Sequence, residues 1–227
     1  MINPFFWFWN LVGKKAVEPI NTPPMPVPKP PISKIPLKEN QYYTKEYPKK
    51  YIFLHHSAGG SAASSVAHWA SNPEHIATPY IIDRDGTIYE CYSPSLWAYH
   101  LGVKGNSQIE KESIGIEICN YGALTMKEGK LLTYTKREIP AEKAVKVDFR
   151  KYIYWESYTP EQIASLKLLL PYLLDKFKIP LQPDRKDFWE YKNPSTLPPG
   201  IYSHTTVRKD KIDIFPQKEL IDLVYNL

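Results

Sequence analysis

The sequence is poor in cysteine and has no long apolar run. Only two of its 227 residues are cysteines, Cys91 and Cys119, and both lie in runs typical of strands. Two cysteines do not make a disulfide framework, so we favour two reduced thiols in the core, with a single bridge as the open alternative. No stretch reaches the roughly 18 apolar residues that span a bilayer. The sequence therefore excludes a small disulfide-held scaffold and predicts no membrane-spanning helix.

A basic groove of the kind that binds nucleic acid is also missing. The formal net charge of +5 favours polyanionic partners, but no run of Lys and Arg alternates with aromatic residues. Acidic cell-wall polymers fit this charge as well as nucleic acid does, and we expect no nucleic-acid partner. Hydrophobic residues make up 43% and charged residues 23% of the chain, which is typical of a globular domain.

The first residues, MINPFFWFWNLV, do not form a standard secretory signal. Such a signal places positive charge before the apolar run, whereas Lys14 and Lys15 follow the run here and Pro4 interrupts it. Two interpretations of residues 1–15 stay open. They form a strand or turn packed on the main domain, or residues 1–12 dock on a particle or a membrane surface, since Trp and Phe favour interfaces.

Proline is abundant in the next segment. Eight prolines fall within residues 19–36, and this composition favours an extended polyproline-type spacer over a helix or a central strand. We therefore predict a linker over residues 16–49 and a single domain over residues 50–227.

The rest of the chain alternates strand-like and helix-like segments. Asp85-Gly86 separates two apolar runs, which indicates a hairpin, and Thr159 with Gln162 forms a capping box at the start of a helix. Residues 123–158 are less regular and predict an inserted hairpin or loop excursion. The pattern predicts a mixed α/β (α+β) domain with a central mixed β-sheet flanked by helices. Strands are expected at 51–56, 79–92 and 113–122, helices at 64–73, 159–177 and 215–227, and a short strand or loop at 202–207.

Histidines and a carboxylate near the ends of two strand-like runs are candidate metal ligands. His55-His56 ends a buried run, and neighbouring strand residues face opposite ways, so only one of the pair can point into a shared site. His204 is followed closely by Asp213. Two imidazoles and one carboxylate form a zinc site with one position open for water, where the metal lowers the pKa of water and polarises a carbonyl. Spacing alone leaves open the alternative that the paired histidines are hydrogen-bonded loop residues.

Four motifs together resemble the type-2 N-acetylmuramoyl-L-alanine amidases, a family that includes phage lysozyme-type amidases and peptidoglycan recognition proteins. They are FLHHSA, YIIDRDGTIYE, SIGIEI and SHTTVRKDKIDIFP, in the family's order, and the resemblance covers about residues 50–227. It implies a zinc site at strand ends and cleavage of the amide bond between N-acetylmuramic acid and L-alanine of peptidoglycan.

The resemblance also implies roles for particular residues. It selects His55 over His56 as the first zinc ligand, with His204 and Asp213 as the others. Lys211 matches the lysine that stabilises charge on the attacked carbonyl. Glu117, in SIGIEI, matches an acid that serves as general base and then as general acid. A charged glutamate in such an apolar strand otherwise needs a partner or an exposed face, because burying an unpaired charge is unfavourable.

Three residues match positions near the substrate. His100, in WAYHLG, matches a residue that lines the substrate groove, and its alternative is a surface-loop histidine. Some phage members carry a tyrosine near the zinc at the place of Thr78, and Tyr80 lies two residues later. We expect Thr78 and Tyr80 beside the substrate, with Glu117 in the tyrosine's catalytic role. The inserted segment 123–158 resembles insertions of phage-type amidases and is expected to cover the groove.

Three functions remain in competition at this stage. The first is a zinc hydrolase that acts on the cell wall from the periplasmic or extracellular side, as a phage endolysin or an injected effector. The second is a non-catalytic peptidoglycan-recognition module, which typically loses a zinc ligand. The third is a structural or cargo component of a phage tail or injection device, docked through its aromatic N-terminus. Because all three ligands are present together with Glu117 and Lys211, we favour the hydrolase.

Overall fold

A computed structural model of the chain describes residues 26–182 and 185–227. The aromatic segment at residues 1–15 lies outside these described residues, so its two interpretations stay as predictions. Within the part of the chain that is described, no helix is both long and apolar enough to cross a membrane.

A six-stranded mixed sheet forms the frame of the domain and confirms the predicted fold class. Its strand order is β1-β4-β3-β5-β2-β11, with β3 and β4 antiparallel and the other neighbours parallel. The two central strands, β2 and β5, each bury five of their six residues, as near-continuous apolar strands of parallel sheets do. The strands are β1 Ser33–Lys34, β2 Tyr51–His56, β3 Tyr80–Ile82, β4 Ile88–Glu90, β5 Ser113–Ile118 and β11 Gly200–Ser203.

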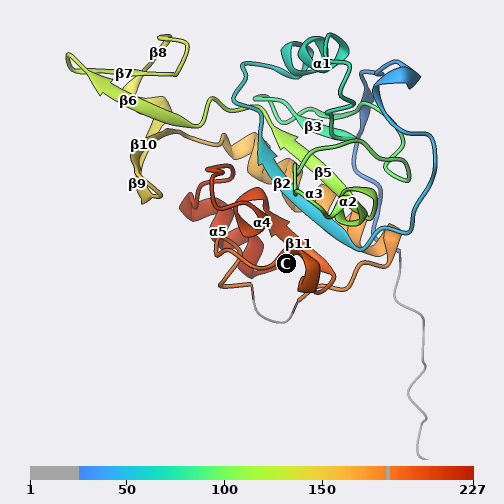
Figure 1. Cartoon of the computed structure of the whole chain (residues 1–227). Helices are drawn as coiled ribbons and strands as arrows, with labels where there is room; N and C mark the ends of the chain where they lie inside the picture. The colour runs from blue at the N-terminus through green and yellow to red at the C-terminus, as the bar shows by residue number, and fades with distance from the viewer. Residues whose placement is uncertain (1–25, 183–184) are drawn as a thin grey trace, which may run out of the picture.

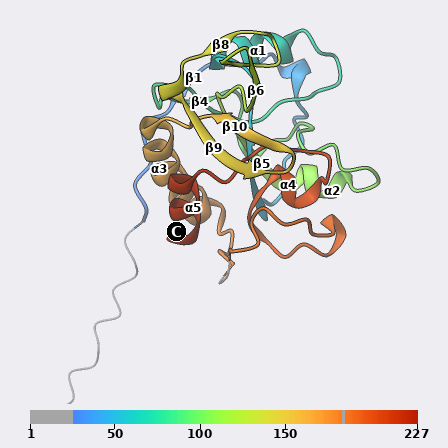
Figure 2. The ribbon, with the colours of Figure 1, turned by 90° about the vertical axis from the view of Figure 1, so that its left-hand side faces the viewer.

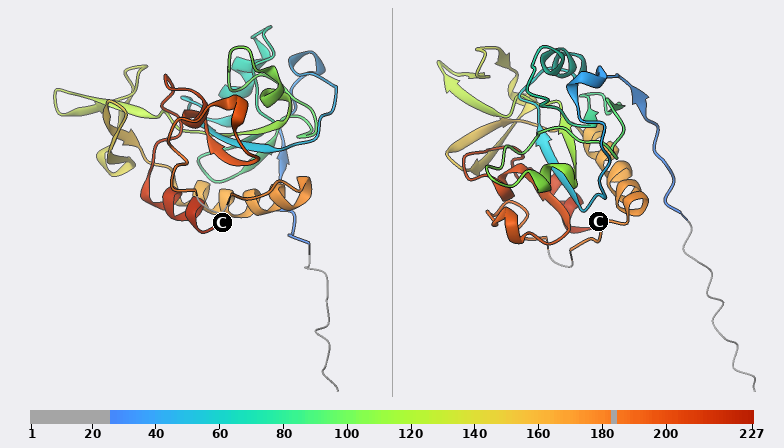
Figure 3. Two further views of the ribbon diagram at one scale, coloured as in Figure 1. Left: turned by 60° about the horizontal axis from the view of Figure 1, so that its bottom comes forward. Right: turned by 45° about the vertical axis from the view of Figure 1, so that its right-hand side comes forward.

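Helices cover both faces of this sheet (Figure 3). On one face, α3 and α5 pack against alternate strand residues such as Leu54 and Ile116. On the other face, α1 packs its Trp69 near Ile81, because successive strand residues point to opposite faces. The helices are α1 Ala62–Ala70, α2 Ser107–Lys111, α3 Pro160–Phe177, α4 His204–Val207 and α5 Lys218–Tyr225, with single 3₁₀ turns η1 Glu39–Gln41, η2 Ala141–Lys143 and η3 Pro194–Thr196.

The helix boundaries follow from their caps. Thr159 and Gln162 form the predicted capping box and start α3 at Pro160. A second box, between Ser61 and Ser64, starts α1 at Ala62, two residues before the predicted start, because its two reciprocal hydrogen bonds satisfy free N–H groups of the first turn. The segment predicted as a short strand or loop at 202–207 divides into the end of β11 and the single turn of α4.

The inserted segment is larger than the predicted hairpin. It forms a separate five-stranded antiparallel sheet in the order β8-β7-β6-β10-β9. In Figure 1 this sheet projects to the left of the main domain, and in Figure 2 it lies in front of it. Its strands are β6 Ala123–Lys127, β7 Lys130–Leu132, β8 Glu138–Ile139, β9 Ala144–Phe149 and β10 Tyr152–Glu156.

Residues 26–49 of the predicted linker lie against the domain. Strand β1 pairs in parallel with the edge strand β4, Leu37 is buried, and the ring of Tyr43 stacks on Trp97 with centroids 4.0 Å apart. Apart from β1 and the single turn of η1, residues 26–49 contain no helix or strand, and they are packed on the domain, unlike a free tether. Pairing along β4 covers backbone groups that an edge strand leaves open.

Both cysteines are free and buried. Cys91 and Cys119 belong to the apolar cluster beneath α1, and burial raises the pKa of the Cys91 thiol to about 12. The two reduced core thiols that we favoured from the sequence are therefore what the structure contains.

Candidate metal centre

The carboxyl ends of two neighbouring parallel strands bring the candidate ligands together. Leu54 of β2 pairs with Ser203 of β11, so the residues that follow them, His55 and His204, reach the same edge of the sheet. Asp213 follows a short loop after α4, and its backbone carbonyl accepts the N–H of Thr205 at 3.2 Å. Three residues spread over most of the domain sequence therefore meet at one point.

Three ligand atoms converge there. His55 Nδ1 lies 3.0 Å from His204 Nδ1 and 3.1 Å from Asp213 Oδ2, and His204 Nδ1 lies 2.9 Å from the same oxygen. Ligands at zinc bond lengths in a tetrahedron stand roughly 3.3 Å apart, so the triangle is close to what the ion requires. Among the described residues this trio is a group of nitrogen and oxygen donors able to hold a metal ion.

The protonation states of His55 and Asp213 favour metal binding. Burial, together with the nearby His204, lowers the pKa of His55 to about 4, so the imidazole is neutral at pH 7. Burial alone would favour the neutral acid of Asp213, but His204 and His55 hold the pKa of its carboxyl well below the usual value. Metal ligands must be a neutral imidazole and a carboxylate, and the site supplies both.

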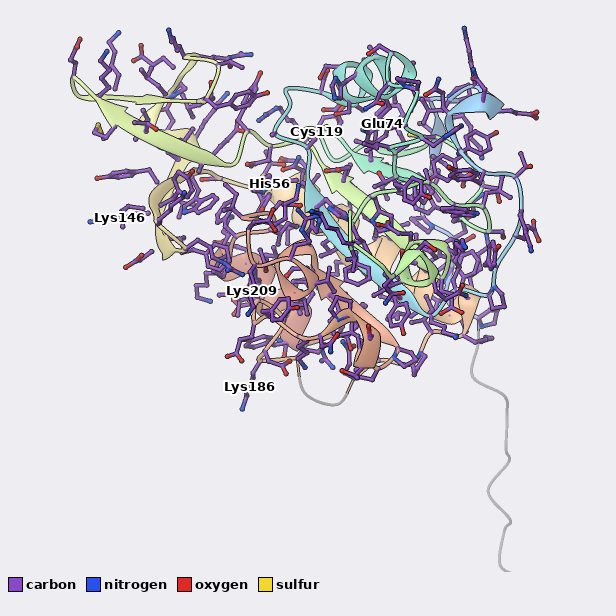
Figure 4. The ribbon with its side chains drawn as sticks, in the orientation of Figure 1. His56, Glu74, Cys119, Lys146, Lys186 and Lys209 are labelled. Atoms are coloured by element: carbon purple, nitrogen blue, oxygen red, sulfur yellow. The ribbon has the colours of Figure 1, made fainter. Side chains whose placement is uncertain are left out.

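The two adjacent histidines of β2 have different environments. His56 points to the opposite face of the sheet, where its Nδ1 lies 3.2 Å from the hydroxyl of Tyr158 and its ring packs near Trp155 and Phe215. Figure 4 shows His56 at the end of β2, between the main domain and the inserted sheet. Gly122 packs against this ring, since a Cβ there would lie 2.5 Å from His56 Nε2. The structure thus places His55 with the other candidate ligands and His56 in the core.

His55 and His204, the two candidate ligand histidines, each use the second ring nitrogen to contact the same turn, at residues 100–101. His55 Nε2 lies 2.9 Å from His100 Nδ1, and His204 Nε2 lies 2.9 Å from the carbonyl oxygen of Leu101. Hydrogen bonds to the second nitrogen fix the tautomer and the ring orientation of a metal-ligating histidine. His100 also lines the hollow over the trio, but its ring nitrogens are engaged with His55 and with Ser113.

Glu117 lies directly beside the trio on β5. It pairs with His55 in the strand register, and its buried Oε2 has no hydrogen-bond partner among the described residues. Burial raises the pKa of Glu117 to about 8, and the charge of Asp213 adds to the effect. A buried acid with a raised pKa and a free oxygen beside candidate ligands can exchange protons near neutral pH.

A hollow of about 640 Å³ opens over these residues. The trio, Glu117 and Lys211 line it from the main domain, and Tyr134 and Tyr152 line it from the inserted segment. A second hollow of about 780 Å³ shares Glu117 and Tyr134 and continues between α1 and the inserted sheet, with Arg137 at its wall. The inserted segment therefore forms one wall of a groove, whereas its sequence gave no indication of which residues face the site.

Thr78 and Tyr80 do not line either hollow, contrary to expectation. Ile81 pairs with Glu117, so alternation turns Tyr80 to the α3 face of the sheet, where its hydroxyl donates to Glu90 at 3.2 Å. The hydroxyl of Thr78 donates to the backbone carbonyl of Tyr80 at 2.9 Å, and the residue is buried. Neither hydroxyl is available to a substrate in this arrangement.

Comparison with known proteins agrees with this architecture. The model of one protein family, described as N-acetylmuramoyl-L-alanine amidase, matches residues 45–217. No curated protein sequence matches the chain. Among solved structures, a mutant of PlyL is similar with a TM-score of 0.53 and 12% identity, covering 86% of this chain and 96% of that one. PlyL itself gives 0.50 and 13%, covering 85% and 90%, and the amidase LysC of Clostridium intestinale gives 0.48 and 16%, covering 86% and 95%. At these identities the structural likeness shows the fold alone.

Proposed function

The chain belongs to the N-acetylmuramoyl-L-alanine amidase family, and from this membership we propose that it is a zinc-dependent hydrolase of peptidoglycan. It cleaves the amide bond between N-acetylmuramic acid and L-alanine. The observation that carries the zinc dependence is the convergence of His55 Nδ1, His204 Nδ1 and Asp213 Oδ2 within about 3 Å of one another, beside a buried acid. A recognition module without activity would have no use for this combination.

The donor set fits zinc. Two neutral imidazoles and one carboxylate leave one coordination position open, which is the pattern of catalytic rather than structural zinc sites. When bound, Zn²⁺ acts as a Lewis acid that polarises the scissile carbonyl and lowers the pKa of water.

Glu117 is proposed to move the proton. Its free carboxylate oxygen faces the site, where it takes a proton from the attacking water and delivers it to the nitrogen of the departing L-alanine. The water oxygen bonds to the carbonyl carbon, the carbon–nitrogen bond breaks, and the products are an acid and an amine. A carboxyl pKa near neutrality suits both the base and the acid half of this task.

Lys211 is proposed to stabilise the charge that develops on the carbonyl oxygen. It lines the same hollow as Glu117 and lies two residues before Asp213. A cation held beside a developing oxyanion contributes more in a partly water-excluded site than in bulk water. The groove between α1 and the inserted sheet receives the rest of the substrate, and His100 acts by holding His55 instead of contacting the substrate.

Delivery forms a separate part of the proposal. The enzyme acts on the bacterial cell wall as an endolysin or an injected effector, and residues 1–15 attach it to a particle or membrane surface, ahead of a proline-rich segment at 16–49 and the catalytic domain at 50–227. Deleting residues 1–15 is expected to leave hydrolysis of purified peptidoglycan intact and to abolish association with particles or vesicles. Unchanged association would remove this part of the proposal without affecting the chemistry.

The central experiment measures the products released from purified peptidoglycan before and after removal of zinc. We expect free stem peptides with new amino termini at L-alanine, loss of release after chelation, and recovery when Zn²⁺ but not Mg²⁺ is restored. Full activity in protein shown to be free of metal would overturn the zinc dependence. Release of new reducing sugar ends instead of peptide would identify a glycosidase.

A further inference from the structure

Glu110 is a buried acid outside the candidate metal centre, and it binds the turn at residues 100–102, which contacts the metal-site histidines. Glu110 lies on α2 and is 2% exposed. Its carboxylate accepts three consecutive backbone N–H groups, from His100 at 2.9 Å, Leu101 at 3.0 Å and Gly102 at 2.7 Å. A buried carboxylate is stable only when hydrogen bonds replace its hydration, and here one turn of backbone supplies all three.

The same turn holds both candidate metal histidines. The His100 ring contacts His55 Nε2, and the Leu101 carbonyl accepts from His204 Nε2. The second nitrogens of two imidazoles from different strands therefore end on two consecutive residues, and Glu110 binds the N–H groups of those two residues. A shift of this turn would rotate both rings together.

The donors and acceptors are consistent along the series of hydrogen bonds from His55 through His100 and Ser113 to Glu110. If His55 presents a free Nδ1 to a metal, its Nε2 carries the proton and donates to His100 Nδ1. His100 then donates from Nε2 to the hydroxyl of Ser113 at 2.7 Å, and that hydroxyl donates to the backbone carbonyl of Glu110 at 3.1 Å. The backbone carbonyl of Glu110 thus accepts the last hydrogen bond of this series, and its carboxylate binds the turn.

The turn has little freedom to adjust on its other side. Gly102 has a φ of 61°, and a Cβ there would lie 2.6 Å from Nη1 of Arg208. The Arg208 guanidinium donates to the carbonyl of Leu101 at 3.2 Å and to that of Gly102. The carboxylate of Glu110 therefore binds the N–H groups of the turn, and the guanidinium of Arg208 binds its carbonyl groups.

We propose that Glu110 is a positioning residue for the metal centre: it fixes the turn at residues 100–102 so that His55 and His204 direct their Nδ1 atoms to a single point. The inference rests on the proposed zinc site but adds a residue that contacts neither metal nor substrate. Hydrogen-bond partners of ligating histidines typically contribute 10- to 100-fold to metal affinity. Because Glu110 supports two ligands at once, we expect an effect within that range.

The test compares Glu110→Gln with Glu112→Gln in the full-length protein. Glutamine keeps the size of Glu110 but replaces one acceptor oxygen with an NH₂ group that opposes a backbone N–H. Glu112 is two residues away and accepts from Lys50 and Gln108 at the surface, which makes it a matched control. Metal-free protein is titrated with Zn²⁺ against a chelator of known affinity, and Co²⁺-substituted protein gives the absorption spectrum of the site.

We expect Glu110→Gln to bind Zn²⁺ 10- to 100-fold more weakly and to change the Co²⁺ spectrum at a temperature where the metal-free variant is folded. Glu112→Gln should stay within twofold of the unchanged protein. Wild-type affinity and an unchanged spectrum in folded Glu110→Gln would overturn the inference. If that variant does not fold, Glu110→Asp, which keeps the charge but shortens the reach, takes its place with the same criteria. Failure of the unchanged protein to bind zinc would instead refute the proposed function.

Discussion

The two sheets of the molecule differ in how deeply they are buried and in what they contribute to the site. Strands β2 and β5 of the six-stranded sheet each bury five of six residues, whereas β9 of the inserted sheet buries none of its six. His55, His204 and Glu117 come from the carboxyl ends of buried strands or directly after them, and Asp213 comes from the loop after α4, whereas the inserted sheet supplies lining residues such as Tyr152. Lys146 of β9 points outward into solvent (Figure 4). The candidate ligands and Glu117 need precise positions, and the close-packed six-stranded sheet holds them in place. Residues that only line a groove need less precise positions, so a less buried sheet is sufficient to carry them.

The inserted sheet is nevertheless joined to the frame through a well-packed aromatic contact. Trp155 of β10 is fully buried and stacks on Phe215 with ring centroids 4.7 Å apart, and Phe215 follows Asp213 by two residues. Beside it, the carboxylate of Glu156 pairs with Arg84 and accepts the N–H of Tyr121 at 2.6 Å. The wall of the groove and the loop that carries Asp213, the third candidate ligand, therefore share an aromatic contact.

The largest effect is expected at Glu117, on the buried sheet. Replacing Glu117 with Gln removes the proton carrier but keeps the shape, so we expect kcat to fall by about 10²–10⁴-fold with zinc content unchanged. Steady-state hydrolysis of peptidoglycan together with metal analysis measures both quantities. A kcat close to that of the unchanged enzyme would show that the buried sheet supplies ligands but no general base.

The next largest effect is expected at Trp155, where the inserted sheet packs on the main domain. Trp155→Ala removes a fully buried indole that also donates to the carbonyl of Val147 at 2.9 Å. We expect the free energy of unfolding to fall by about 3–5 kcal/mol, measured by chemical denaturation of the metal-free protein. A loss below about 1 kcal/mol would mean that the inserted sheet is only loosely attached.

A buried acid of the six-stranded sheet should make the free energy of unfolding depend on pH, whereas an exposed acid of the inserted sheet should not. The pKa of Glu117 is raised by burial from 4.5 to about 8, so the folded metal-free protein keeps a proton that the unfolded chain releases above pH 4.5. The contribution of this group is therefore present at low pH and is lost as pH rises through 8. Relative to the unchanged protein, Glu117→Gln should gain up to about 4 kcal/mol of stability between pH 5 and pH 8.

Denaturant unfolding of metal-free protein at the two pH values tests this gain. Glu138→Gln on the inserted sheet, which removes an exposed partner of Lys130, serves as the control and should show no such slope. An equal difference between Glu117→Gln and the unchanged protein at both pH values would contradict the prediction.

The smallest effect is expected at the wall of the groove. Tyr134 is 70% exposed and lines both hollows, so Tyr134→Ala should change the free energy of unfolding by no more than about 0.5 kcal/mol. Loss of its ring from the substrate groove should raise KM about 2- to 10-fold with little change in kcat. Tyr191, another exposed tyrosine outside both hollows, is the matched control. Equal KM values for the two variants would show that Tyr134 does not contact the substrate.

The sequence predicted those parts of the structure that depend on local pattern or on motif order. The capping box of α3, the hairpin at Asp85-Gly86 and the buried strand ending in His55-His56 all rest on neighbouring residues, and the structure confirms them. Family motifs named His204 and Asp213, which spacing alone could not have paired with His55 across 149 and 158 residues.

Other features depend on contacts that no local pattern encodes. Glu110 lies in a polar stretch, NSQIEKES, that reads as an exposed helical turn, and only the fold places three backbone N–H groups around its carboxylate. The five-stranded sheet at 123–156 could not be foreseen because its strands are only two to six residues long and no local pattern encodes their pairing. We expected Tyr80 beside the substrate because it lies two residues after Thr78 in the sequence. The alternation of side chains along β3 instead places it on the α3 face of the sheet.

The path of residues 26–34 determines how the domain is presented to its surroundings. Helix α3 begins beside the carboxyl edge of the sheet, where Gln162 donates to the carbonyl of Cys119, and its 18 residues extend roughly 27 Å toward the opposite edge. The backbone N–H of Val27 donates to Asp175 near that far end, away from the carboxyl ends of the strands, where the candidate ligands lie. A support attached at Val27 would therefore lie opposite the groove and leave the groove open to solvent.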